Sequence, residues 1–308
     1  MSRVDHDGGT AGHAIGHAID NRGNVLRGAL LMAGAAAGYA ILHGSVRYIS
    51  AEIHPFEITF FRNLFGFIVL LPWFVVHGLK PLRTRRIGLH LLRATSNVVA
   101  MMMFFTALSM TPLVLVQALG FTAPLFATVL AIFILGERVR LRRWVALIAG
   151  FVGALIIIRP GIQPIDTGSL LTLGSAAVWG FTLITIKILS RTDSAVTITA
   201  YMVLLMSPLS LLPALYYWTW PDGQAWFWLV VCGVAGTAAQ LLMAQSFRVA
   251  EATVVLPIDF TKIVWGALIG YLAFGEVVDI WTWIGAAVIF SGITYITYRE
   301  RKLAKPLK

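Results

Sequence analysis

The chain contains few charged residues and a single cysteine. Only 12% of its 308 residues are Asp, Glu, Lys or Arg, whereas 58% are hydrophobic. So few polar side chains cannot cover the surface of a water-soluble protein of this length, and the composition therefore predicts a membrane protein. The one cysteine, Cys232, excludes an internal disulfide and a cysteine-cluster metal site.

Sequence motifs of enzymes are also absent. The chain has no Gly-Lys-Ser/Thr loop that would cradle phosphate, no His-Glu-x-x-His and no paired-cysteine metal spacing. Three histidines near the N-terminus, His6, His13 and His17, have no fixed spacing on a predicted element. We therefore expect no enzymatic activity, no cofactor and no metal, and an energy source that is a gradient rather than bound ATP.

Basic residues outnumber acidic ones, 24 to 14, which gives a net charge of +10. A nucleic-acid-binding protein would gather them on one solvated face. Here they form short clusters between apolar runs, for example from Arg138 to Arg143. This pattern predicts a lipid bilayer as partner and no nucleic acid, with the clusters on the cytoplasmic side.

Apolar runs of about 20 residues, separated by charges, glycines, prolines and polar turns, predict ten transmembrane helices. Basic connections follow the even-numbered spans, so both termini are predicted to be cytoplasmic. Residues 1–24 are predicted to be a disordered cytoplasmic tail, and residues 299–308 a basic cytoplasmic tail. No cleavable signal peptide is expected, because no cationic start precedes an apolar core at the N-terminus. The predicted spans are 25–46, 56–77, 89–109, 112–135, 144–159, 168–188, 196–217, 226–246, 252–274 and 280–298.

One stretch of the chain occurs twice. Phe121–Gly153 and Phe260–Gly292 align without a gap at an offset of 139 positions. Apolar composition alone would not keep such identities in step, so the alignment indicates duplication. Arg138, Arg140, Arg142 and Arg143 are not repeated, as expected if the two copies face opposite sides of a membrane. The shared residues are Phe121/Phe260, Thr122/Thr261, Gly136/Gly275, Glu137/Glu276, Trp144/Trp283 and Gly153/Gly292.

The front of each half repeats more weakly, at an offset of 140, through pairs such as Tyr39/Trp179 and Arg47/Lys187. The predicted fold is therefore an all-α polytopic membrane protein, in which ten transmembrane helices form two inverted five-helix repeats around a central cavity. The first repeat is expected at 25–159, a connecting loop at 160–167 and the second repeat at 168–298. Inverted repeats of this kind are typical of secondary transporters that work by alternating access.

These features resemble the drug/metabolite transporter superfamily, in its ten-helix EamA-type branch. The resemblance is carried by the turns Leu135-Gly136-Glu137 and Phe274-Gly275-Glu276, by Phe61-Arg62-Asn63 and by Ala123-Pro124-Leu125-Phe126. It covers residues 25–298 and is closest to bacterial exporters of aromatic amino acids. It implies a carrier in the bacterial inner membrane whose central cavity is lined by the first, third, fourth, sixth, eighth and ninth helices.

The search for a substrate site starts from polar residues at mid-membrane depth. Lys262 lies near the middle of the ninth span, where a charge costs about 2.5–3.5 kcal/mol. Asp259 lies three residues earlier, on the same helical face, and can share that charge. Two interpretations stay open: a self-neutralising pair locked between helices, or a pair that opens when a substrate carboxylate or ammonium arrives. Pro257 would leave backbone carbonyls free at the same depth.

Other candidates follow from depth and helical spacing. Tyr39, Trp179, Phe121 and Trp265 could form a cage for a flat aromatic or large apolar group, although each could equally pack against helices or lipid. His43 could couple transport to protons or be a hydrogen-bonded packing residue. Arg62 and Arg93 are interpreted as structural residues that reach the headgroups, and Glu57 is expected to pair with Arg62. The full predicted substrate site is Tyr39, His43, Asn97, Met101, Gln117, Phe121, Trp179, Gln240, Asp259, Lys262 and Trp265.

Three functions are compatible with these observations. The first is a secondary exporter of amino acids, preferentially aromatic ones, that binds a small-molecule substrate and acts as a monomer. The second is a carrier for a different metabolite or drug class. The third, a receptor or intramembrane enzyme, would need a soluble sensory domain or a nucleophile with a base at one depth, and the sequence has neither.

Overall fold

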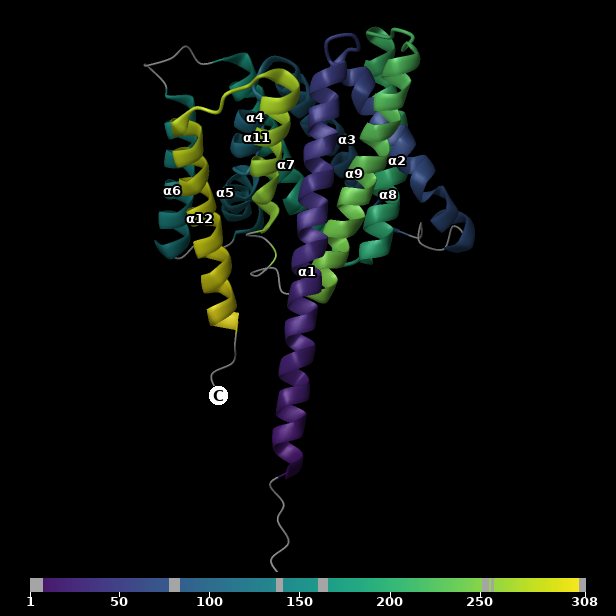
Figure 1. The fold of residues 1–308 in the computed structure, drawn as a ribbon. Helices are drawn as coiled ribbons and strands as arrows, with labels where there is room; N and C mark the ends of the chain where they lie inside the picture. The colour runs from purple at the N-terminus through teal and green to yellow at the C-terminus, as the bar shows by residue number, and fades with distance from the viewer. Residues whose placement is uncertain are drawn as a thin grey trace, which may run out of the picture.

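The computed structural model describes residues 8–77, 84–136, 141–159, 166–250, 255 and 258–304. Within these ranges the regular structure is helical throughout (Figure 1). The first half contains α1 Gly8–Ile49, α2 Pro55–His77, α3 Ile87–Met110, α4 Leu113–Gly120, α5 Ala123–Leu135 and α6 Leu141–Ile158. The second half contains α7 Thr167–Leu189, α8 Ala195–Tyr216, α9 Gly223–Val249, α11 Thr261–Phe274 and α12 Ile280–Ala304.

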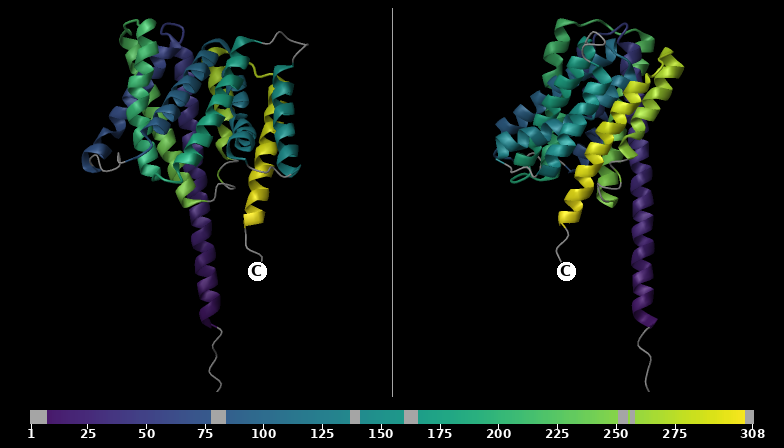
Figure 2. Two further views of the ribbon diagram at one scale, coloured as in Figure 1. Left: turned by 180° about the vertical axis from the view of Figure 1, so that it is seen from behind. Right: turned by 90° about the vertical axis from the view of Figure 1, so that its left-hand side faces the viewer.

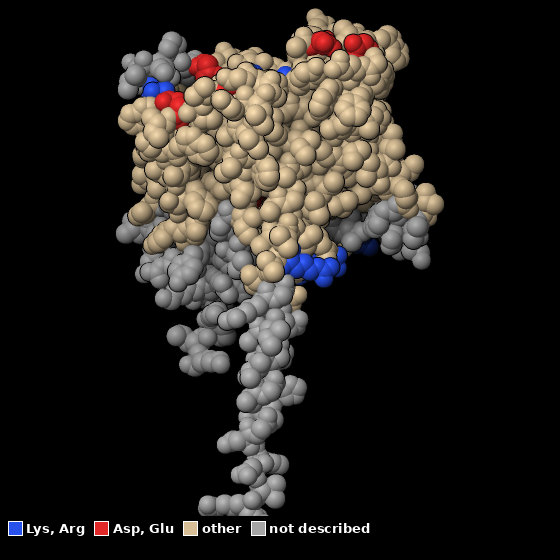
Figure 3. Space-filling model, in the orientation of Figure 1, with Lys and Arg blue, Asp and Glu red and all other residues tan. Residues whose placement is uncertain are grey.

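The helices confirm a polytopic membrane protein. Seven spans in the described part of the chain are long and apolar enough to cross a bilayer, within α1, α2, α3, α4 with α5, α7, α8 and α9. Helices α6, α11 and α12 carry shorter apolar runs at three further predicted positions. On the face shown in Figure 3, the visible charged side chains gather near the two ends, and the broad band between them is nearly uncharged. Such a band suits contact with lipid chains.

Two terminal segments differ from the predicted tails. Helix α1 begins at Gly8, so part of the segment predicted as disordered is helical and projects from the bundle (Figures 1 and 2). Helix α12 likewise continues to Ala304. Adding turns to an existing helix needs no new nucleus, which explains why polar composition alone misplaces both ends. The start of α1 and the end of α12 lie at the same end of the bundle.

The fourth predicted span is not one continuous helix. It is interrupted between α4 and α5 at Phe121 and Thr122, immediately before Pro124, which cannot donate a backbone hydrogen bond. The Thr122 hydroxyl and the Thr122 backbone N–H both donate to the carbonyl of Leu119, at 2.7 and 3.0 Å. In the second half, α11 begins just after Phe260, and Thr261 donates to the carbonyl three residues earlier at 2.7 Å. Both interruptions fall at repeated residues.

The two Gly-Glu turns adopt the same backbone conformation where it is described. Gly136 ends α5 and Gly275 ends α11, each with φ of 65°. A side chain would strain this left-handed conformation, so glycine is the residue that can end both helices there. Glu137 lies outside the described residues, whereas the Glu276 carboxylate accepts a hydrogen bond from the Leu113 backbone N–H at 2.9 Å.

One end of the bundle is closed by Arg47 at the end of α1. Its guanidinium forms an ion pair with Glu276 at 2.8 Å and donates to the carbonyl of Leu108 at 2.9 Å. The group thereby joins α1 to α3 and to the turn after α11. The sequence suggested that Glu57 pairs with Arg62, but the structure shows no such pair. Glu57 instead accepts hydrogen bonds at 3.1 Å from the backbone and hydroxyl of Thr219.

The second half begins with a capped helix. Asp166 accepts a hydrogen bond from the Ser169 backbone N–H at 2.9 Å and another from the Thr111 hydroxyl at 2.7 Å. Burial alone would raise the pKa of the Asp166 carboxyl, but these hydrogen bonds outweigh burial and lower the pKa below its ordinary 3.8. The connecting segment 160–165 lies outside the described residues.

Helices from the two halves pack against each other. Helix α1 packs along α9, α3 along α7, α2 along α8 and α6 along α12. Small residues permit the last contact: a Cβ added at Gly153 would lie 2.7 Å from the side chain of Ile289, and one at Gly285 would collide with Ile157. This interleaving leaves a space at the centre of the bundle.

Candidate functional site

The central space is a cavity of about 340 Å³, within the range of roughly 300–1,000 Å³ that is typical of small-molecule sites. Its walls come from the six spans that the resemblance implies, which are α1, α3, α4, α7, α9 and α11. Helices α2 and α8 also contribute, through Arg62, Met202 and Met206. Nine of the eleven predicted site residues line it: Tyr39, His43, Asn97, Met101, Gln117, Phe121, Trp179, Gln240 and Lys262.

Lys262 carries its charge to the cavity wall. Its ammonium lies 2.8 Å from the carboxylate of Asp259, as the three-residue spacing predicts. The same ammonium lies 4.2 Å from the ring centre of Phe121 and 5.8 Å from that of Tyr39. Asp259 does not itself line the cavity, so it supports Lys262 from behind. The ammonium is therefore shared between a carboxylate and two aromatic faces that a ligand could reach.

The two helix interruptions meet at the centre. Phe121 and Phe260, the residues at the interruptions, stack with ring centres 3.9 Å apart and an interplanar angle of 14°. Phe121 also faces the cavity. The stacked pair thus places an aromatic surface beside the Lys262 ammonium, where each half of the chain is least regular.

A polar pair lies between the first and fourth spans. The amide nitrogen of Gln117 is 3.4 Å from Nδ1 of His43, and the Gln117 carbonyl oxygen is buried without a hydrogen-bond partner in the described chain. The His43 ring packs against Tyr39 and Phe104, with ring centres 6.2 and 5.0 Å away. The Gln117 oxygen packs against Gly266, where an added Cβ would collide with it. The proton-coupling role of His43 stays a prediction.

The interpretation of Arg62 and Arg93 as headgroup-seeking residues is wrong. Both are buried and line the cavity. Arg62 donates to the side chain of Asn63 at 3.1 Å, and Arg93 donates to the carbonyl of Ile198 at 3.0 Å. Neither forms an ion pair within the described chain. Both residues lie in the first half of their helices, where a long side chain could also reach the headgroups, so their position in the sequence did not reveal that they face a cavity.

Trp265 does not line the cavity, although helical spacing predicts that it would. Its side chain is 42% exposed on the outer face of α11. Lys262 lies at the start of this helix and reaches inward with a long flexible side chain, so its own direction does not fix that of the residue one turn later. The predicted four-residue aromatic cage therefore contains three residues: Tyr39, Phe121 and Trp179.

Methionines form one part of the wall, of which the sequence predicted only Met101. Met202 and Met206 of α8 line the cavity with Met101 and Met243. The amide of Asn97 lies 3.5 and 3.4 Å from the sulfurs of Met202 and Met206. Thioether side chains are flexible and polarisable, so this wall can adapt to the shape of a bound ring.

The sequence is similar to known transporters along nearly its whole length. Residues 26–159 and 166–298 each match the EamA-like transporter family. The chain is 35% identical to the riboflavin transporter of Vibrio cholerae over 91% of this chain and 96% of the relative. It is 29% identical to the S-adenosylmethionine uptake transporter of Rickettsia felis, over 83% of this chain and 87% of the relative.

A protein of known crystal structure has the same fold, with a TM-score of 0.60 at 18% identity and coverage of 92% of this chain and 100% of the other. The relatives are named for riboflavin and S-adenosylmethionine, so the comparisons do not support a resemblance to aromatic amino-acid exporters. They favour the alternative, a carrier for a different metabolite. The family match to both halves shows that this chain belongs to the EamA-like transporter family and is a multi-pass membrane transporter.

Proposed function

We propose that this protein carries riboflavin or a closely related flavin across the bacterial inner membrane. The observation that carries the proposal is the 35% identity to a riboflavin transporter over nearly the full length of both chains. The cavity supports it, because aromatic faces and hydrogen-bond donors share one wall. The proposal replaces amino acids as the expected substrate.

A flavin ring suits the chemistry of this wall. The ring system is flat and carries carbonyl oxygens and ring nitrogens that accept hydrogen bonds. Trp179 offers a face for stacking, Phe121 adds an apolar contact, and Lys262 and Arg93 offer donors. The substrate would then lie across the interrupted helices at the centre of the bundle.

S-adenosylmethionine is the second candidate, since relatives of that name match 83% of this chain. It carries two cationic groups, a sulfonium and an ammonium, and one carboxylate, so its net charge is +1. The cavity already holds Arg62 and Arg93 without a carboxylate partner in the described chain, whereas the charge of Lys262 is balanced by Asp259. A further cation about 8 Å from one arginine would be repelled by about 2 kcal/mol at an effective dielectric constant of 20. The charge of the cavity therefore favours a neutral flavin.

Transport would proceed by alternating access between two inverted halves. The packing pattern supports this proposal, because exchanging the halves exchanges the contacts: α1 with α9 corresponds to α7 with α3, and α2 with α9 corresponds to α8 with α3. The interrupted helices and the two left-handed glycines recur at repeated positions. With both termini cytoplasmic, rocking of the halves would expose the cavity to each side in turn.

The inverted arrangement can be tested by labelling. Single cysteines introduced at the repeated positions Arg138 and Val277, in a Cys232→Ala background, should react with a membrane-impermeant maleimide from opposite sides of sealed membranes. Val277 is 86% exposed, so the reagent can reach a cysteine at this position. Labelling of both positions from the same compartment would contradict the inverted repeat.

Riboflavin transport can be tested with purified protein in liposomes. We expect saturable entry of radiolabelled riboflavin, blocked by excess unlabelled riboflavin and weakly or not at all by S-adenosylmethionine or tryptophan. Protein-free liposomes provide the control. An imposed pH gradient tests coupling through His43, which His43→Gln should abolish if the histidine carries the proton. Riboflavin entry at the rate of protein-free liposomes would refute the proposal. Saturable entry of radiolabelled S-adenosylmethionine in that case would select the second candidate.

A further inference from the structure

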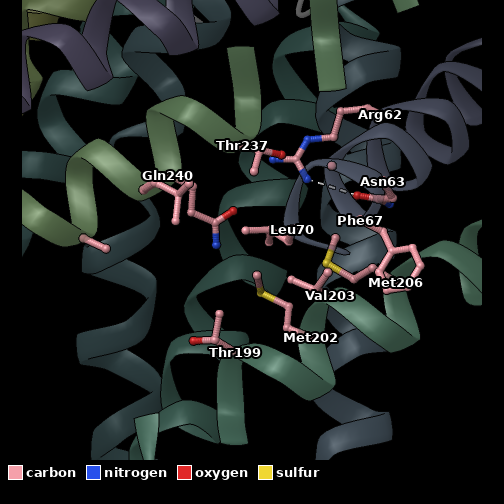
Figure 4. Close-up of a pocket in the computed structure, with 13 residues that line it drawn as sticks. Arg62, Asn63, Phe67, Leu70, Thr199, Met202, Val203, Met206, Thr237 and Gln240 are labelled. Carbon is pink, nitrogen blue, oxygen red and sulfur yellow. Dashed lines mark hydrogen bonds between the residues drawn. The ribbon is translucent and has the colours of Figure 1, made fainter. Parts of the chain in front are cut away.

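A second, smaller pocket adjoins the central cavity between α2, α8 and α9 (Figure 4). Its volume is about 120 Å³. It shares Arg62, Met202, Met206 and Gln240 with the main cavity, so these four residues form the boundary between the two spaces. We call it the Arg62 pocket. It is much too small for a three-ring system and is placed to hold a group attached to one.

The Arg62 pocket contains an incompletely bonded cation. Arg62 is 8% exposed, and one guanidinium nitrogen donates to Asn63 at 3.1 Å. Its Nε atom is buried and has no hydrogen-bond partner in the described part of the chain. This atom packs against Gly236, where an added Cβ would lie 3.1 Å from it. The terminal guanidinium nitrogens carry more N–H donors than the bond to Asn63 uses, so a ligand that accepts from them would gain charge-assisted hydrogen bonds. Figure 4 shows the guanidinium directed into the pocket.

Further polar groups surround this cation. Figure 4 shows the amide of Gln240 directed into the same space from α9, and Thr237 lies one turn before it. Thr237 is 5% exposed. Its hydroxyl would lie 2.8 Å from a Cβ placed on Gly66, so the glycine keeps this part of the pocket open. Arginine only donates, whereas the amide and the hydroxyl both donate and accept.

The rest of the wall is mainly apolar. Phe67, Leu70 and Val203 line it beside the methionines, and Asn63 and Thr199 are further polar residues of the lining. A chain of carbon atoms that carries several hydroxyl groups matches this combination, because its carbons can contact the apolar wall while its hydroxyls exchange hydrogen bonds with the polar side chains. No carboxylate lines the pocket in the described residues, so a cationic group would find no partner there.

We propose that the Arg62 pocket binds the hydroxylated side chain of the substrate while its ring system occupies the central cavity. This inference rests on the proposed flavin transport and adds the group by which the carrier recognises its substrate. Arg62, Thr237 and Gln240 then determine specificity for the side chain, and the aromatic residues of the central cavity bind the ring. A flavin without the hydroxylated chain would leave the remaining donors of Arg62 without a ligand acceptor and bind more weakly.

The test compares two competitors of radiolabelled riboflavin uptake in liposomes. Unlabelled riboflavin carries the ribityl chain, whereas lumiflavin carries a methyl group in its place. The wild-type protein should prefer riboflavin by about tenfold or more. Thr237→Val should reduce that preference by about 2- to 10-fold, and Arg62→Gln by about 10-fold or more, while inhibition by lumiflavin stays within about threefold of wild type.

Thr185→Val is the matched control, because the Thr185 hydroxyl is buried and donates within α7 to Thr182, away from the pocket. It should leave the preference unchanged. If Arg62→Gln fails to fold, Thr237→Val decides, since valine has nearly the same shape as threonine.

Each other outcome overturns the inference. A wild-type protein that takes up no riboflavin would overturn the proposed function and this inference with it. Wild-type uptake of riboflavin with an equal response to lumiflavin, or with a preference that Thr237→Val and Arg62→Gln leave intact, would overturn the inference alone. Flavin mononucleotide that inhibits ten times more strongly than riboflavin would assign the pocket to a phosphate instead of hydroxyl groups.

Discussion

Replacing Lys262 by methionine tests whether this ammonium binds substrate or only neutralises Asp259. The two charges are 2.8 Å apart, and their side chains are 20% and 14% exposed. At an effective dielectric constant of 20, this separation corresponds to an attraction of about 6 kcal/mol, which is largely offset by the cost of removing both charges from water. The intact pair therefore contributes little net free energy to folding, whereas either charge left alone would destabilise the protein.

Lys262→Met should destabilise the protein by about 3–5 kcal/mol, because it leaves the Asp259 carboxylate buried without its cation. Lys262→Met combined with Asp259→Asn removes both charges and should recover most of that loss. Thermal unfolding in detergent, followed by intrinsic fluorescence, measures both effects. The double variant thus provides a folded protein without the ammonium.

Riboflavin uptake by the double variant then decides the role of Lys262. A lost hydrogen bond from a charged donor costs about 1.5–3 kcal/mol, so apparent affinity should fall by roughly 10- to 150-fold even though stability is regained. Asp259→Asn alone, which keeps the ammonium, should transport better than the double variant. Wild-type uptake by the double variant would refute a substrate contact and leave Lys262 a purely structural partner.

Three further predictions concern stability. Glu276→Gln should lower the thermal midpoint by the equivalent of about 1–3 kcal/mol, because it removes the ion pair with Arg47; an unchanged midpoint would contradict the closing role of this pair. Asp166→Ala should cost about 1 kcal/mol through the lost helix cap. Since the pKa of Asp166 is lowered on folding, that difference should be full above about pH 4 and disappear as the pH falls further, and a pH-independent difference in denaturant titrations would refute it. Gly285→Ala should cost about 1–3 kcal/mol by separating α6 from α12, whereas Gly223→Ala, with open space around it, should not.

The sequence predicted the features that depend on local spacing. Asp259 and Lys262, three residues apart, form the expected pair, and nine of the eleven predicted residues line one cavity. The repeat placed Gly136 and Gly275 at equivalent turns, and the structure gives both the same left-handed conformation. Residues on one helical face at similar depth meet when the helices close around a common space, so these features could be inferred without coordinates.

The remaining features depend on how separate helices meet. Arg62 could not pair with Glu57, because five positions place the two side chains on different faces of α2, and Thr219 from a distant loop takes the carboxylate instead. Met202 and Met206 reach the cavity only because α8 packs beside α3. Trp265 was misplaced because the long side chain of Lys262 does not follow its helical face. The direction of a long side chain and the contacts between distant helices depend on packing. The spacing of residues along one helix does not determine either of them.

Equilibrium binding of riboflavin to two tryptophan variants tests most directly whether the central cavity is the substrate site. Trp179 and Trp265 are 41% and 42% exposed, but only Trp179 lines the cavity. Titration of riboflavin fluorescence should show binding about 3- to 10-fold weaker for Trp179→Ala, through lost stacking, and unchanged for Trp265→Ala. Equal weakening by both substitutions, or wild-type binding by Trp179→Ala, would contradict a substrate site in this cavity.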